Sequence, residues 1–210
     1  MAPSVYYQDS LVTIYHGDCR ESAPGLAYGV IVADPPYGIG ATCMALGNGR
    51  RRIDRGDRAW DDAPGDIGAI LTLRAVPAIV WGGNYFLLPP SRCWLVWDKG
   101  TGDNDYADCE LAWTNLDRVV KRYHRGWVGR NAREAGEDRL HPTQKPVDLM
   151  RWCLGFLPTG AVVLDPFMGS GTTLVAAKSL GRRAIGIEIE ERYCEVAAQR
   201  CSQEVLGLGA

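Results

Sequence analysis

Two short motifs hold the residue types in this chain that can do chemistry, and they begin 131 residues apart, at positions 34 and 165. The first is Asp34-Pro35-Pro36-Tyr37, and the second is Asp165-Pro166-Phe167-Met168-Gly169-Ser170-Gly171-Thr172-Thr173. Each follows an apolar run typical of a buried strand, so each is predicted at the edge of an α/β sheet where ligands bind. The first motif suits a planar ring bearing an amine, and the second lets backbone approach a cofactor closely. Together they predict an enzyme that moves a group from a cofactor to a nucleobase.

The acidic first motif matches what an exocyclic amine needs. Such an amine is a poor nucleophile because its lone pair is delocalised into the ring, so an enzyme must accept hydrogen bonds from its N–H groups. The carboxylate of Asp34 and the carbonyl of Pro35 are two suitable acceptors, and Pro35-Pro36 stiffens the turn that aims them. Tyr37 offers a ring for stacking on the base. The alternative is that an Asp-Pro-Pro turn simply ends a strand.

The second motif predicts a nucleoside cofactor. Gly169 and Gly171 expose backbone amides before a helix, and Glu188, 19 residues after Gly169, stands where a ribose diol finds its acceptor. No lysine follows as in a P-loop, and the third glycine of a dinucleotide motif is absent. Asp165 would repel a phosphate and suits an amino group. S-adenosylmethionine, which carries a ribose, an amino group and a sulfonium but no phosphate, fits these features.

The elements that position these motifs read as alternating strands and helices. Strands are predicted at 11–15, 30–33, 78–81, 93–97, 162–164 and 184–187, with an antiparallel pair at 109–114 and 118–123. Helices are predicted at 67–76, 147–157, 172–180 and 190–204. The last third is therefore a βαβ unit around the second motif.

Bulk properties narrow the class of protein. A length of 210 residues suits one domain, and seven cysteines without metal-ligand spacing indicate reduced thiols and no metal site. The net charge is −2, but arginines cluster around residues 50–58 and 118–133, where they can neutralise phosphates. No run is long and apolar enough for a membrane span, so a soluble, cytoplasmic protein is expected.

The motifs resemble those of the amino-directed DNA methyltransferases, which modify adenine N6 or cytosine N4. The resemblance implies S-adenosylmethionine as cofactor and double-stranded DNA as partner. It implies four catalytic residues: Asp34, Pro35, Pro36 and Tyr37. It implies cofactor contacts from the second motif and from three further segments (His16 to Cys19, the His141-Pro142-Thr143-Gln144-Lys145-Pro146 run, and Glu188): Asp18, Thr143, Lys145, Asp165, Pro166, Phe167, Gly169, Ser170, Gly171, Thr172 and Glu188.

The catalytic motif precedes the cofactor motif, which is similar to the β group of that family. The fold implied is a Rossmann-like α/β fold, a mostly parallel sheet with one reversed strand and helices on both faces. We expect a single catalytic domain over 1–210, with a target-base half at 1–114, a small recognition insertion at 115–140 and a cofactor half at 141–210. The small insertion predicts a short recognition sequence or loose specificity.

The sequence is compatible with several alternatives. Asp-Pro-Pro-Tyr favours adenine N6, whereas cytosine N4, an RNA adenine or a silent DNA-binding homologue are the other interpretations. A bacterial or phage-infected cell is the expected setting. The recognition sequence, monomeric or homodimeric state, and pairing with a restriction enzyme are not indicated by the sequence.

Overall fold

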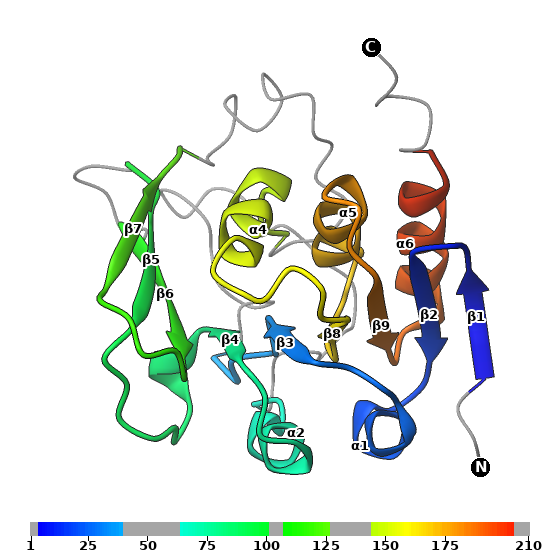
Figure 1. Ribbon diagram of the computed structural model, residues 1–210, viewed down its shortest axis with the longest axis horizontal. Coiled ribbons are helices and arrows are strands. Elements are labelled where there is room, and N and C mark those ends of the chain that lie inside the picture. Colours follow the sequence, from blue (N-terminus) through cyan, green and yellow to red (C-terminus); the bar gives the residue numbers. More distant parts are fainter. Residues whose placement is uncertain (1–3, 40–63, 101–106, 127–143, 204–210) are drawn as a thin grey trace, which may run out of the picture.

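The computed structural model describes residues 4–39, 64–100, 107–126 and 144–203. Its described strands form one nine-stranded sheet in the order β1-β2-β9-β8-β3-β4-β6-β5-β7 (Figure 1). Seven strands run in the same direction: β2 (Val12–His16), β9 (Ala184–Glu188), β8 (Val163–Asp165), β3 (Val30–Ala33), β4 (Ala78–Trp81), β5 (Trp94–Asp98) and β7 (Lys121–His124). The predicted mostly parallel α/β fold is confirmed.

Two strands are reversed rather than the one expected: β6 (Cys109–Thr114), between β4 and β5, and β1 (Ser4–Gln8), at the edge beside β2. The extra reversal arises from a tight turn. Asp9 Oδ1 accepts hydrogen bonds from the amides of Leu11 and Val12, both at 2.8 Å, which turns the chain straight back on itself. A hairpin necessarily gives antiparallel strands.

The predicted antiparallel pairing of 109–114 with 118–123 is wrong. β6 already has β4 on one side and β5 on the other, so it offers no free edge. The chain after β6 instead crosses to the outer edge of β5, where β7 pairs in parallel, with Leu95 opposite Lys121. The described part of the expected recognition insertion thus belongs to the sheet itself, while residues 127–140 lie outside the described ranges.

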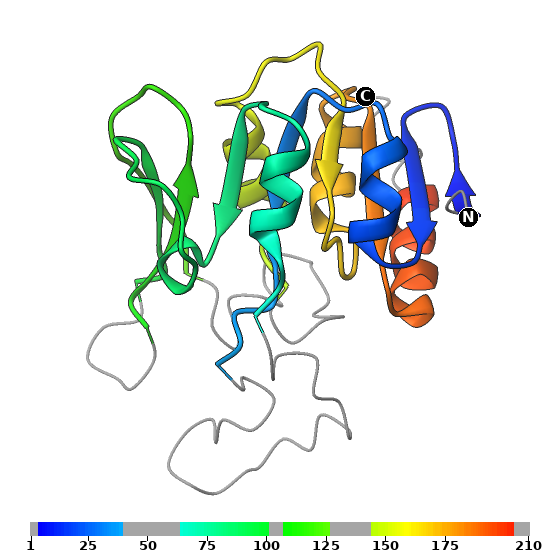
Figure 2. The same ribbon diagram turned by 90° about the horizontal axis from the view of Figure 1, so that it is seen from below.

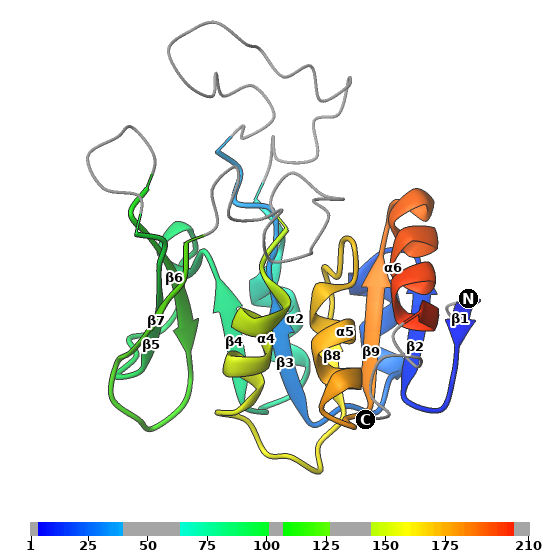
Figure 3. The same cartoon turned by 90° about the horizontal axis from the view of Figure 1, so that it is seen from above.

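Helices cover both faces of the sheet, as Figures 2 and 3 show from opposite sides. One face carries α1 (Cys19–Ser22) and α2 (Ile67–Leu73), and the other carries α4 (Val147–Leu154), α5 (Thr172–Ser179) and α6 (Glu191–Gln203). Alternate residues of β3 serve the two cores: Val30 and Val32 pack with α4 to α6, and Ile31 and Ala33 pack with α2. This two-sided burial explains why β3 is apolar throughout.

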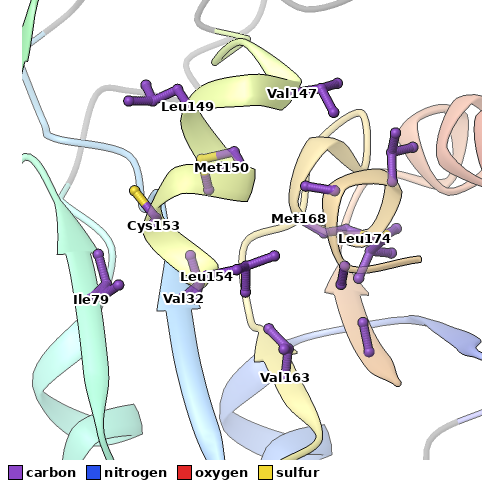
Figure 4. Close-up of a cluster of buried hydrophobic side chains, with 14 of the residues drawn as sticks. Val32, Ile79, Val147, Leu149, Met150, Cys153, Leu154, Val163, Met168 and Leu174 are labelled. Carbon is purple, nitrogen blue, oxygen red and sulfur yellow. The ribbon is translucent and has the colours of Figure 1, made fainter. Parts of the chain in front are cut away.

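The packing of α4 onto the sheet matters for the site. Met150, Cys153 and Leu154 project from α4 toward the sheet, near Val32 and Ile79 (Figure 4). Full burial of a Met or Leu side chain, as at Met150 and Leu154, is worth about 1.5–3 kcal/mol. The helix begins at Val147, two residues after Lys145, so this contact fixes the position of the lysine backbone.

Candidate active site

The two sequence motifs lie side by side because their strands are neighbours. β3 pairs in parallel with β8, Val30 opposite Val163 and Ile31 opposite Leu164, so Asp34 and Asp165 leave the sheet at the same edge. A cavity of about 530 Å³ opens there and is lined by residues of both motifs. Direct strand pairing thus brings together two motifs that begin 131 residues apart in the sequence.

Asp34 is bound by two hydrogen-bond donors of this chain. Lys145 Nζ lies 2.7 Å from both Asp34 carboxylate oxygens, and Tyr37 Oη donates to Asp34 Oδ1 at 2.8 Å. The Lys145 side chain is 5% exposed and that of Asp34 is 22% exposed. Burial raises the pKa of Asp34 above its ordinary value, and the ammonium of Lys145 limits that rise.

A second acid shares the same ammonium. Lys145 Nζ lies 3.2 Å from Glu110 Oε2, and Lys99 Nζ lies 2.5 Å from Glu110 Oε1. Burial opposes the charge on Lys145, but the carboxylates of Asp34 and Glu110 raise its pKa well above its ordinary value. Burial likewise acts to raise the pKa of Glu110, and the ammonium groups of Lys145 and Lys99 outweigh it and lower that pKa. The result is a line of alternating charges: Lys99, Glu110, Lys145, Asp34.

Tyr37 is packed closely by other aromatic rings. Tyr85 stacks on it with ring centroids 5.0 Å apart and planes at 17°, and Phe86 meets it edge-on at 6.4 Å. Gly82 makes this packing possible, since a Cβ at Gly82 would lie 2.2 Å from the Tyr37 ring and its φ is +66°. The partly exposed Tyr85 therefore covers a face of the ring that the sequence assigned to base stacking.

The glycine-rich turn is held by Glu188 and by α6. The amide of Gly169 donates to Glu188 Oε2 at 2.9 Å, and the amide of Glu190 donates to Glu188 Oε1 at 2.8 Å. Gly171 has φ +79°, and a Cβ there would lie 2.7 Å from the Cβ of Ala197 on α6. Gly171 thus serves close helix packing, and it does not line the cavity.

Asp165 is a buried acid at the start of that turn, with 2% of its surface exposed. Burial raises its pKa to about 7, while a hydrogen bond from the Thr173 side chain and another from the Phe167 amide (3.1 Å) oppose the rise. The neighbouring charges of Asp34 and Glu188 also favour its protonated form. This carboxyl therefore titrates near neutrality and can accept a hydrogen bond from a cationic group.

Glu188 and Asp18 lie at the end of the cavity beside β2 and β9. Gly17, just before Asp18, donates its amide to the Glu188 carbonyl at 2.9 Å, which ties the two segments together. Burial raises the pKa of Glu188, against the amide hydrogen bonds that it accepts. Asp18 caps α1 and pairs with Arg20, whose hydrogen bonds lower the Asp18 pKa.

Most of the predicted site residues line this one cavity: Asp18, Asp34, Pro35, Pro36, Tyr37, Lys145, Asp165, Pro166, Phe167, Gly169, Ser170, Thr172 and Glu188. Thr143 lies outside the described residues. Lys145, expected to contact the cofactor, binds Asp34 in this structure. Sequence reasoning did not identify Glu110, although a carboxylate inside the apolar strand 109–114 was a signal that it had a specific partner.

Within the described ranges, no cluster of three or more His, Cys, Asp or Glu side chains is arranged to hold a metal ion. In the same ranges, no helix is long and apolar enough to cross a membrane.

The fold of the chain is similar to folds of solved structures, which defines the class of protein. The chain resembles the M1.HpyAVI–S-adenosylmethionine complex with a TM-score of 0.58 and 22% identity, over 91% of this chain and 100% of that one. It resembles the cytosine-N4-specific PvuII DNA methyltransferase with a TM-score of 0.60 and 15% identity, over 94% and 89% of the two chains. The fold is the Rossmann-like fold of S-adenosylmethionine-dependent methyltransferases.

Sequence comparison then gives the family. Residues 88–199, about half of the chain, match the N6/N4 DNA methylase profile, so the chain belongs to that DNA methylase family, whose cofactor is S-adenosylmethionine. The family predicted from the motifs is confirmed.

Two curated relatives share parts of the sequence. The chain is 41% identical over 103 residues to the Type II methyltransferase M2.DpnII of Streptococcus pneumoniae. The aligned segment covers 48% of this chain and 33% of the relative. It is 45% identical over 80 residues to the Type II methyltransferase M.BglII of Bacillus subtilis. Here the aligned segment covers 37% of this chain and 22% of the relative. The matched segments cover a third or less of these relatives.

Proposed function

We propose that this protein transfers a methyl group from S-adenosylmethionine to the N6 amine of an adenine flipped out of double-stranded DNA. One observation carries the proposal: the Asp34 carboxylate opens into the same cavity as the Gly169 turn and Glu188. An acceptor for an amine and a turn suited to a nucleoside cofactor thus face one cavity. Family membership supports DNA as the substrate.

The residues around the turn fit the cofactor chemically. Glu188 presents a carboxylate that suits a ribose diol, and Asp18 lies at the same end, where it suits the adenine of the cofactor. Asp165 is a buried carboxyl that titrates near neutrality and suits the amino group. When bound, S-adenosylmethionine supplies the electrophilic methyl group.

The target side of the cavity binds and orients the base. Flipping the base costs a few kcal/mol of unstacking, which contacts inside the cavity must offset. The Asp34 carboxylate and the Pro35 carbonyl accept hydrogen bonds from the amine, which localises its lone pair on nitrogen. Tyr37, with its neighbour Tyr85, contributes aromatic surface for the base. The amine itself is the nucleophile, so no covalent bond to the protein is needed.

The part of the chain that contacts DNA includes the strand β7. Its Lys121 and Arg122 are exposed, and Arg118 lies just before it, so several cations project from one edge of the sheet. Such side chains contact phosphates without reading sequence. The names of the two relatives support a Type II restriction–modification role in the bacterial cytoplasm.

Adenine is the preferred base because the motif has aspartate before Pro-Pro-Tyr. The second candidate is cytosine N4, favoured by the similarity of the fold to the cytosine-N4-specific PvuII enzyme. Both reactions use the same acceptor chemistry at Asp34, so the product distinguishes them.

The experiment incubates the protein with methyl-labelled S-adenosylmethionine and unmethylated genomic DNA, then digests the DNA and identifies its nucleosides by mass spectrometry. Labelled N6-methyldeoxyadenosine is the expected product. Labelled N4-methyldeoxycytidine assigns the second candidate. Absence of any labelled nucleoside, with the cofactor bound, contradicts both and indicates an RNA substrate or a silent homologue.

A further inference from the structure

The ammonium of Lys145 lies where the proposed reaction needs an empty acceptor. It contacts both oxygens of Asp34 at 2.7 Å, and Tyr37 Oη donates to one of the same oxygens. A substrate amine needs those oxygens for its own N–H groups. In the arrangement described here, the catalytic carboxylate is therefore satisfied by the protein itself.

A neutral amine cannot easily displace an ammonium from a carboxylate. Hydrogen bonds between charged partners are roughly twice as strong as those between neutral partners. Water is also a poor alternative partner for the displaced ammonium, because the Lys145 side chain is 5% exposed. Lys145 needs another acceptor inside the cavity wall before Asp34 can receive a substrate.

We propose that Glu110 is a positioning residue that draws the ammonium of Lys145 away from Asp34 when the substrate amine binds. The inference rests on the proposed function, since it is the amine at Asp34 that requires the exchange. Glu110 does not touch the base. It acts through Lys145, whose ammonium keeps a carboxylate partner throughout.

The ammonium of Lys145 has only a short distance to move in this exchange. Lys145 Nζ is already 3.2 Å from Glu110 Oε2, so a small movement away from Asp34 turns a shared ion pair into one with Glu110 alone. Lys99 Nζ holds the other oxygen, Glu110 Oε1, at 2.5 Å, which fixes the direction of the carboxylate.

The charges remain balanced during the movement. Two carboxylates and two ammonium groups form the line, and the entering amine is neutral, so no net charge is added to the buried site. The rings of Tyr37 and Trp81 lie 5.7 and 5.4 Å from Lys145 Nζ, distances at which an aromatic ring stabilises a cation. An isolated Lys145–Asp34 pair would have no such second position.

The test begins with Glu110→Gln, which keeps the shape of the side chain and removes its charge. Among the described residues, Asp34 is then the anionic partner that remains to Lys145. We therefore expect kcat to fall by about 10- to 100-fold, the range for one hydrogen bond to a charged group. The Kd for S-adenosylmethionine and the KM for DNA are expected to stay unchanged, because phosphate contacts dominate DNA affinity. Asp117→Asn is the matched control, since Asp117 is an exposed acid paired with Arg92, and it should keep wild-type kcat.

The decisive comparison adds Glu110→Gln to Lys145→Met and measures single-turnover rates. With no ammonium left to move, Glu110→Gln should lower the rate no further. A second loss as large as in the wild-type background would overturn the proposal, as would wild-type kcat in Glu110→Gln alone. Where Glu110→Gln does not fold, Glu110→Asp, which withdraws the carboxylate by one methylene, takes its place. A wild-type protein that methylates no DNA contradicts the proposed function itself, whereas an active wild type with a fully active Glu110 variant contradicts this inference alone.

Discussion

Replacing Asp165 by asparagine should change how the stability of the protein depends on pH. Asp165 is buried and its pKa is raised to about 7, whereas an aspartate in the unfolded chain titrates near 3.8. Between these values the folded protein holds a proton that the unfolded chain has released. The contribution of Asp165 to the free energy of unfolding is therefore largest at low pH and falls as pH rises toward 7. Above pH 7 it no longer changes. Asparagine has no charge to bury and should show no such loss.

The size of the effect follows from the difference between the two pKa values. That difference is about 3 units, and each unit corresponds to about 1.36 kcal/mol, so the whole range is worth about 4 kcal/mol. Solvent screening reduces this free energy only slightly, because only 2% of Asp165 is exposed. Between pH 5 and pH 8 the wild type should lose about 3 kcal/mol relative to Asp165→Asn, since about two of the three units lie there.

Urea unfolding of both proteins at intervals from pH 5 to pH 8 measures this difference. Groups that do not interact with Asp165, such as Asp9 with a pKa lowered to about 2, contribute equally to both proteins and cancel. Asp117→Asn, which removes an exposed acid, should run parallel to the wild type. Parallel curves for wild type and Asp165→Asn would show that Asp165 titrates normally and would refute the reasoning from burial.

Three further substitutions test other parts of the site. Asp34→Ala should lower kcat at least about 100-fold through loss of the acceptor, with cofactor binding retained by calorimetry; normal turnover would contradict the role of Asp34. Glu188→Gln should weaken S-adenosylmethionine binding by about 10- to 100-fold in calorimetry, because a charged acceptor is lost; unchanged affinity would exclude Glu188 as the ribose ligand. Gly82→Ala should destabilise the protein by about 2 kcal/mol or more in urea unfolding and lower kcat, since a Cβ would lie 2.2 Å from the Tyr37 ring at a left-handed φ; wild-type values for both would show that this close approach is unimportant.

The sequence predicted the elements of the fold well and the pairing of its outer strands poorly. The strands 30–33 and 78–81 were located correctly because residues buried on both faces must be apolar throughout. The parallel pairing of β7 with β5 has no comparable local signal. It depends on which sheet edges other strands have already occupied, and no short stretch of sequence records that.

The site residues likewise divide into those that the sequence could predict and those that it could not. Residues of the two motifs were recognisable because a strand, a turn and the residues that follow it are contiguous. The contact between Lys145 and Asp34 joins positions 111 residues apart and exists because α4 packs onto the sheet. Glu110 enters the site from a third strand, so its role depends on the order of strands rather than on any motif.

The arrangement of the outer elements also bears on why the catalytic motif can precede the cofactor motif. The last described helix, α6, packs against β1 and β2, the first described strands, so the first and last described elements are neighbours, although β1 begins and α6 ends on opposite sides of the molecule (Figure 1). Every described strand pair would survive if a linker running along α6 joined these two elements and the chain were opened at a surface turn elsewhere. A circular permutation of this kind changes the order of the two motifs along the sequence and leaves the three-dimensional site unchanged.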